Sequence, residues 1–117
     1  MRIAGLGFRR GASAESLAAA LALVGAAEAL ATAEDKVHEP GLQRLARRLA
    51  VKVHAVSRAA LEAQGVEGSV GVMAVYGTGS VAEAAALAAA GPGARLVVGR
   101  RTSPDGMAVA ALAETAP

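Results

Sequence analysis

Apolar positions recur along this chain with two alternating periods, one typical of strands and one typical of helices. Strands are predicted over 2–7, 29–32 and 51–57, and helices over 14–24, 41–49 and 59–64. Ser13 is a favourable N-cap for the first helix, and Gly25 is a typical residue after a helix end. Strands and helices therefore alternate through the first half of the chain.

The second half begins with an ambiguous apolar segment, 69–76, whose periodicity permits a strand. Ser80 and Glu83 then match a capping box, in which the serine hydroxyl caps free amides and the glutamate reaches back. This pattern predicts a helix that ends at Gly91. The remaining residues, 94–114, predict a β-hairpin, with Ser103-Pro104-Asp105-Gly106 as a type I turn.

The order of these elements predicts an α/β fold, a three-layer sandwich around a mostly parallel sheet with an antiparallel C-terminal hairpin. A length of 117 residues is that of a single domain, 1–117. Because right-handed crossovers bring strand-to-helix loops to one edge of a sheet, the loops 7–13, 32–39 and 57–58 are expected to meet. The turn at 76–80 is expected to join them.

Composition limits the chemistry of the protein. Apolar residues make up 54% of the chain, but Phe8 and Tyr76 are the only aromatic residues, so small side chains, leucine and valine must fill the core. Cysteine is absent, which excludes disulfides and thiolate chemistry. With only His38 and His54 as imidazole ligands, we expect neither a metal nor a cofactor.

Charge and hydropathy indicate the class of ligand. The net charge is +2, the isoelectric point is about 9.7, and no run of lysine or arginine exceeds two residues. Because aromatic side chains for stacking on bases are nearly absent, an anionic small molecule is favoured over nucleic acid. No apolar segment is long enough to predict a membrane span, and no signal peptide is recognised, so a cytoplasmic location is expected.

The stretch "GLGFRRGASAES" predicts a strand, a glycine turn and the start of a helix, which is the arrangement of many anion-binding loops. Three interpretations stay open: a dinucleotide loop, with Glu34 or Asp35 as the ribose-binding acid; a tight turn alone; or a loop for another anion. Two arginines argue against close approach of a dinucleotide, and Arg9 is the favoured carboxylate ligand. The candidate binding residues of this loop are Gly7, Arg9, Gly11 and Ser13.

Five further residues are candidates for the same edge of the sheet. Lys36 and Glu39 form either a solvated surface ion pair or a fixed charge pair beside the ligand. Thr32 either contacts the ligand or only ends its strand. Ser80 and Glu83 either cap their helix alone or also mark a helix N-terminus that receives an anionic group.

Taken together, four stretches resemble the CobE/CbiG C-terminal domain family of cobalamin biosynthesis: "GLGFRRGASAE", "ATAEDKVHEPGLQRLA", "GTGSVAEAAALAAAG" and "ARLVVGRRTSPDGMAVA". The resemblance covers nearly the whole chain. The family motifs are matched by Gly5–Gly11, by Lys36, Glu39 and Gly41, and by Ser80–Ala86. Phe8 stands where many relatives have cysteine, and Arg100 or Arg101 replaces a common lysine, which weakens any claim for thiol or lysine chemistry.

The resemblance implies a role in building the corrin ring. The implied partners are a precorrin or hydrogenobyrinate-type tetrapyrrole, and other cobalamin pathway enzymes. Such a ligand carries many carboxylates around an apolar macrocycle, which Arg9, Lys36 and the helix N-termini after Ser13 and Ser80 are suited to meet. Two alternatives remain: a hydrolase or lyase acting on a ring substituent, as when the two-part CbiG protein opens the δ-lactone of cobalt-precorrin-5A and releases acetaldehyde, and a nucleotide-binding module.

Overall fold

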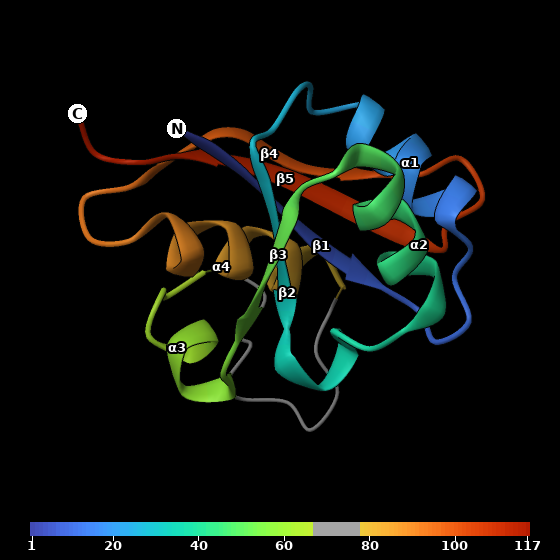
Figure 1. The fold of residues 1–117 in the computed structure, drawn as a ribbon. Helices are drawn as coiled ribbons and strands as arrows, with labels where there is room; N and C mark the ends of the chain where they lie inside the picture. The colour runs from blue at the N-terminus through green and yellow to red at the C-terminus, as the bar shows by residue number, and fades with distance from the viewer. Residues whose placement is uncertain (67–77) are drawn as a thin grey trace.

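The computed structural model of the chain describes residues 1–66 and 78–117, which form a mixed α/β fold around a five-stranded sheet (Figure 1). The strands are Arg2–Phe8 (β1), Ala29–Ala33 (β2), Lys52–Val56 (β3), Arg95–Thr102 (β4) and Ala108–Glu114 (β5). The helices of the described part are Ala14–Ala22 (α1), the 3₁₀ turn Glu34–Lys36 (η1), Pro40–Leu49 (α2), Arg58–Glu62 (α3) and Thr78–Ala90 (α4).

The predicted α/β class is confirmed, and the ends of the three strands and three helices predicted in the first half of the chain lie within two residues of the observed ends. The ambiguous segment 69–76 lies outside the described residues. Within the described ranges, no helix has the length and apolar character needed to cross a membrane.

The strands lie in the order β3-β2-β1-β5-β4. β1, β2 and β3 run parallel to one another, whereas β5 runs antiparallel to both of its neighbours, β1 and β4. The predicted turn of the hairpin is closed by a hydrogen bond from the Gly106 N–H to the Ser103 carbonyl oxygen (2.9 Å). The mostly parallel sheet with an antiparallel C-terminal hairpin is thus confirmed.

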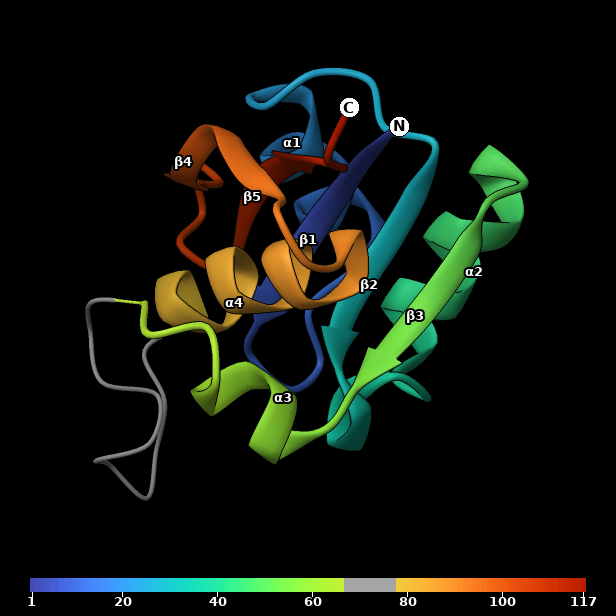
Figure 2. The same cartoon turned by 90° about the vertical axis from the view of Figure 1, so that its left-hand side faces the viewer.

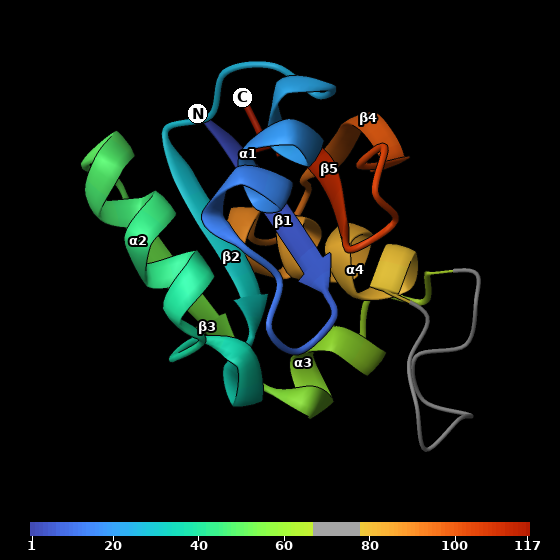
Figure 3. The same ribbon diagram turned by 90° about the vertical axis from the view of Figure 1, so that its right-hand side faces the viewer.

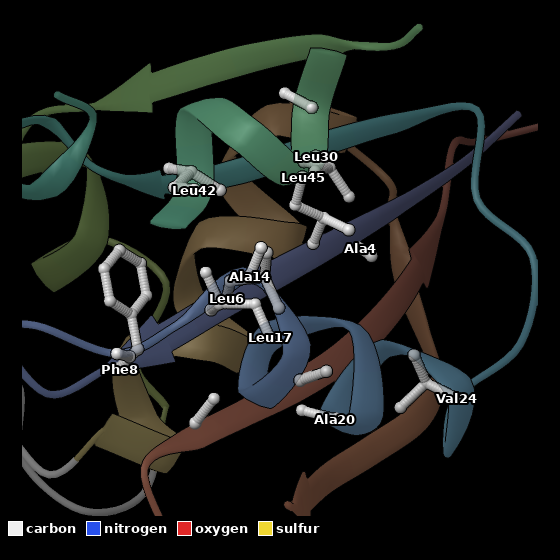
Figure 4. Close-up of a cluster of buried hydrophobic side chains, with 14 of the residues drawn as sticks. Ala4, Leu6, Phe8, Ala14, Leu17, Ala20, Val24, Leu30, Leu42 and Leu45 are labelled. Atoms are coloured by element: carbon white, nitrogen blue, oxygen red, sulfur yellow. The ribbon is translucent and has the colours of Figure 1, made fainter. Parts of the chain in front are cut away.

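The side chains of β1 alternate between two apolar layers, because successive residues of a strand point to opposite faces. Leu6 and Phe8 lie on the face covered by α1 and α2, where they pack with Leu17 and Leu45 (Figure 4). Ile3 lies on the opposite face, in a second cluster that includes residues of α3 and α4. Burial on both faces fixes β1 at the centre of the molecule.

Helix α4 lies against β1 at a separation that only glycine permits. A Cβ atom on Gly5 would lie 1.9 Å from the carbonyl oxygen of Ala82 and 2.7 Å from the backbone nitrogen of Ala86. Ala82 and Ala86 are fully buried, as are Ala84 and Ala85 of the same helix. Figure 2 shows α4 crossing the sheet beside β1. Gly5 therefore serves the packing of strand and helix rather than the glycine turn.

Candidate functional site

The glycine stretch forms a tight turn over Arg9–Ala12, directly after the end of β1. The turn is closed by a hydrogen bond from the Ala12 N–H to the Arg9 carbonyl oxygen (3.0 Å). Gly11 occupies its third position with φ of +83°, where a residue with a Cβ would be strained. The last glycine of the motif is thus required by the backbone of the turn.

The backbone N–H groups of this turn are largely used within the protein. The Arg9 N–H donates to the Met107 carbonyl oxygen (2.9 Å), and the Gly11 N–H donates to Oε1 of Glu39 (3.0 Å). The Ala12 N–H closes the turn itself. A phosphate-binding glycine loop needs such groups free for its ligand. Since a carboxylate of the chain already holds one of them, the geometry disfavours a dinucleotide loop.

Lys36 and Glu39 contact the glycine turn rather than each other. Lys36 Nζ donates to the carbonyl oxygen of Phe8 (3.0 Å) and lies 5.3 Å from the centroid of the Phe8 ring. Glu39 accepts the hydrogen bond from the Gly11 N–H described above. Among the described residues, Lys36 and Glu39 do not form an ion pair with each other. The surface ion pair considered from the sequence is therefore not formed, and both charged side chains are held at the glycine turn instead.

The side chains of Arg9 and Arg10 are exposed on this turn. Within residues 1–66 and 78–117, neither guanidinium has a hydrogen bond or ion pair. By contrast, five arginines of the described part form ion pairs: Arg2, Arg48, Arg58, Arg95 and Arg100. The two arginines of the turn are therefore available to an anion from solution. Figure 3 shows the turn projecting beyond the end of β1.

The N-terminus of α1 lies beside the turn and already faces two carboxylates. Ser13 is the predicted N-cap, and its Oγ accepts from the Ser16 N–H (3.1 Å), which confirms the cap. The Ser16 hydroxyl donates to Asp105, which also accepts from Ser103 Oγ (2.6 Å) and from the Met107 N–H (3.0 Å). Glu15 in the same turn of helix pairs with Arg48 (3.2 Å).

Hydrogen bonds from Ser103, Ser16 and Met107 lower the pKa of Asp105 to about 2, so it is ionised at neutral pH. A ligand carboxylate approaching the N-terminus of α1 would therefore be repelled by the carboxylates of Asp105 and Glu15. The sequence pattern around Asp105 predicts only a turn, so this carboxylate was not among the predicted site residues. The hairpin pattern alone does not place this turn; in the structure β5 runs antiparallel to both β1 and β4, which brings the turn after β4 to the edge where β1 ends.

Gly7 and Thr32 lie beneath the turn, inside the sheet. Gly7 is buried in β1 opposite Val109 of β5. Thr32 is fully buried in β2, and its hydroxyl donates to the carbonyl oxygen of Leu6 (2.8 Å). The Thr32 hydroxyl thus joins β2 to β1 just before the turn begins.

The capping box predicted at Ser80 and Glu83 is wrong. Helix α4 begins at Thr78, so Ser80 lies inside the helix, and its side chain is buried. Glu83 accepts hydrogen bonds from the Arg100 backbone N–H (2.9 Å) and guanidinium (2.8 Å). Burial raises the pKa of Glu83, but these bonds from Arg100 lower it by more. Glu83 therefore fastens α4 to β4.

Two of the loops predicted to meet at one edge of the sheet, 7–13 and 32–39, contact each other, whereas the turn predicted at 76–80 begins outside the described residues. Residues 36–39 contact residues 8–11 through the two bonds described above. α3, which begins after the loop at 57, lies at the same edge in Figures 2 and 3. The turn at 103–107 joins them through Met107. In the described part of the chain, His, Asp and Glu side chains form no group of three placed to hold a metal ion.

Comparisons with known proteins match the chain along nearly its whole length. A family model described as cobalamin synthesis G C-terminus matches residues 2–113. The chain is 36% identical to the cobalamin biosynthesis protein chiG from Agrobacterium tumefaciens, covering 100% of both chains with a TM-score of 0.76. It is 40% identical to CobE, a protein from the cobalamin (vitamin B12) biosynthetic pathway, with a TM-score of 0.78 over 97% of this chain and 89% of that one. Curated proteins give no match.

Proposed function

The chain belongs to the family described as cobalamin synthesis G C-terminus, and from that premise we propose that it binds a precorrin-type or hydrogenobyrinate-type tetrapyrrole and assists its processing. In this proposal the sheet is the middle layer of a three-layer sandwich, and the binding surface is the edge where β1, β2 and β3 end. The partners are the tetrapyrrole and, for its delivery or processing, other enzymes of the cobalamin pathway.

The observation that carries the proposal is the pair of exposed arginines on the turn Arg9–Ala12. Both guanidinium groups lack partners among the described residues, and the turn that presents them is held by hydrogen bonds on both sides. A tetrapyrrole of this pathway carries several carboxylates around its ring, and arginine binds a carboxylate with two parallel hydrogen bonds. Two adjacent arginines can therefore hold neighbouring acid side chains of one macrocycle.

The other candidate residues contribute to this surface in different ways. Lys36 adds a positive charge next to the turn, Glu39 and Gly11 shape its backbone, and Gly7 lies beneath it in β1. Ser13 begins the helix beside it, and Thr32 joins β1 to β2 beneath it. Glu83 supports the surface at greater distance by holding α4 on β4, and Ser80 is buried inside the same helix.

Absorbance titration with hydrogenobyrinic acid tests the proposal. We expect saturable binding to the full chain, and about tenfold weaker binding to Arg9→Ala and to Arg10→Ala, the loss expected for one charge-assisted pair. Arg95→Ala is the matched control, because it removes the same charge at the opposite end of the sheet, where Arg95 pairs with Glu114. No spectral change with hydrogenobyrinic acid or with precorrin intermediates, or equal weakening by Arg95→Ala, would contradict the proposal.

One arrangement gives the enzymatic alternative a specific starting point. The hydroxyl of Ser13 donates to the hydroxyl of Ser16 (3.1 Å), which donates in turn to Asp105. This chain links a hydroxyl to a carboxylate, but a carboxylate with a pKa of about 2 is a weak base. We therefore favour binding over hydrolysis. Acetaldehyde release from a lactone-containing intermediate, abolished in Ser13→Ala, would reverse that preference.

A further inference from the structure

We infer that Lys36, Glu39 and Gly41 are positioning residues, which hold the turn Arg9–Ala12 in the conformation that presents Arg9 and Arg10, and that they do not contact the ligand. The inference deepens the proposed function and rests on it for what the arginines bind. It concerns one segment, 36–41, which joins η1 to the start of α2. We call this segment the clamp.

The clamp contacts the backbone on both sides of the two arginines. Lys36 Nζ bonds the carbonyl oxygen of Phe8 (3.0 Å), immediately before them, and Glu39 Oε1 bonds the Gly11 N–H (3.0 Å), immediately after them. A Cβ atom on Gly41 would lie 2.1 Å from the carbonyl oxygen of Ala12, so glycine lets the start of α2 lie directly against the turn. Three residues of the clamp thus meet three backbone groups that flank the arginines.

Each side chain is suited to a contact with backbone rather than with a ligand. Lys36 is half-buried, and its ammonium group lies over the Phe8 ring while bonding the Phe8 carbonyl oxygen. Glu39 carries a negative charge, which opposes rather than favours an anionic ligand at the same turn. The role of Glu39 at this turn is therefore to fix the backbone, because its Oε1 accepts the hydrogen bond from the Gly11 N–H. A turn that is already ordered avoids the entropy cost of ordering on binding.

Two substitutions of Glu39 separate geometry from charge. Glu39→Gln and Glu39→Ala remove the same negative charge, but only Glu39→Gln keeps an oxygen that accepts from the Gly11 N–H. We expect Glu39→Gln to bind hydrogenobyrinic acid as tightly as the unmodified protein or more tightly, and Glu39→Ala to bind about three- to tenfold more weakly, the range for one lost hydrogen bond. Lys36→Arg, which keeps a donor, and Lys36→Met, which loses it, should give the same contrast.

Solvent exchange of the Gly11 amide, followed by NMR without any ligand, tests the clamp independently of the proposed function. We expect slow exchange of the Gly11 amide in the unmodified protein and in Glu39→Gln, and at least several-fold faster exchange in Glu39→Ala, with the amides of β1 unchanged. Should Glu39→Ala not fold, Lys36→Met is followed instead, at the amides of Arg9 and Gly11.

Two results would overturn the inference: Gly11 exchange that is the same in Glu39→Ala and Glu39→Gln, or a loss of binding that is equal in both variants. If the unmodified protein binds no tetrapyrrole but Gly11 exchange follows the expected pattern, the proposed ligand is wrong and the clamp stands. The two failures are therefore distinguishable.

Discussion

Replacing Gly5 by alanine should destabilise the protein strongly, although only one methyl group is added. That Cβ would lie 1.9 Å from the Ala82 carbonyl oxygen, whereas ordinary contact begins at 3.4 Å, so α4 would have to move by about 1.5 Å away from β1. The clashing atoms are backbone, so no change of rotamer relieves the overlap. Because overpacking a core lowers the free energy of unfolding by about 1–3 kcal/mol, and occasionally more, we expect Gly5→Ala to lower it by about 3 kcal/mol.

Urea unfolding followed by circular dichroism measures this loss. With a slope of about 1–3 kcal/mol per molar urea, the midpoint should fall by at least about 1 M while the slope stays constant. Gly65→Ala is the control, because its Cβ meets no atom within 4 Å and only its φ of +62° causes strain, worth about 1–2 kcal/mol. Ala82→Gly should not rescue Gly5→Ala. A Gly5→Ala variant that is no less stable than Gly65→Ala would refute this explanation of the packing.

Three smaller predictions concern single polar contacts. Thr32→Val leaves the Leu6 carbonyl oxygen without its buried donor and should lower the free energy of unfolding by about 1–3 kcal/mol in urea titration. Asp105→Asn should destabilise the protein above pH 4 but not near pH 2. The pKa of Asp105 is lowered to about 2 in the folded state, so the stability contributed by the ionised carboxylate is complete above the pKa of the unfolded state and is lost as the pH falls towards 2. Melting temperatures of both proteins from pH 2 to 6 measure this difference. Arg48→Ala should change the unfolding free energy by less than about 1 kcal/mol, because its pair with Glu15 is exposed, and a larger change would mean that the pair holds α1 to α2.

The sequence was sufficient for features that depend on neighbouring residues. Apolar periodicity located the strands and helices, Ser13 identified the start of α1, and Ser103-Pro104-Asp105-Gly106 identified the hairpin turn. Each of these follows from conformational preferences over a few residues. The meeting of loops at one edge also followed, because it depends only on the handedness of crossovers.

Contacts between distant residues were beyond the sequence. Gly5 was assigned to a phosphate-type motif, but β1 extends to Phe8, so this glycine lies inside the strand and faces α4. Ser80 and Glu83 matched a capping box that is not formed, because α4 already begins at Thr78, and Glu83 bonds Arg100 of β4 instead. The side chain of a charged residue is satisfied by whichever partner the fold brings near, and short patterns do not contain that partner.

The position of β5 between β1 and β4 has a consequence for how the protein is made. β5 is a central strand, yet its residue Glu114 pairs with Arg2 across 112 positions of sequence. At about 5–20 residues per second, a ribosome needs roughly 5–20 seconds to reach β5 after completing β1. During that time β1 has no neighbour on the side that β5 will occupy, and that open edge is able to pair with other chains. We expect the nascent chain to depend on holding factors at the ribosome more than its small size suggests.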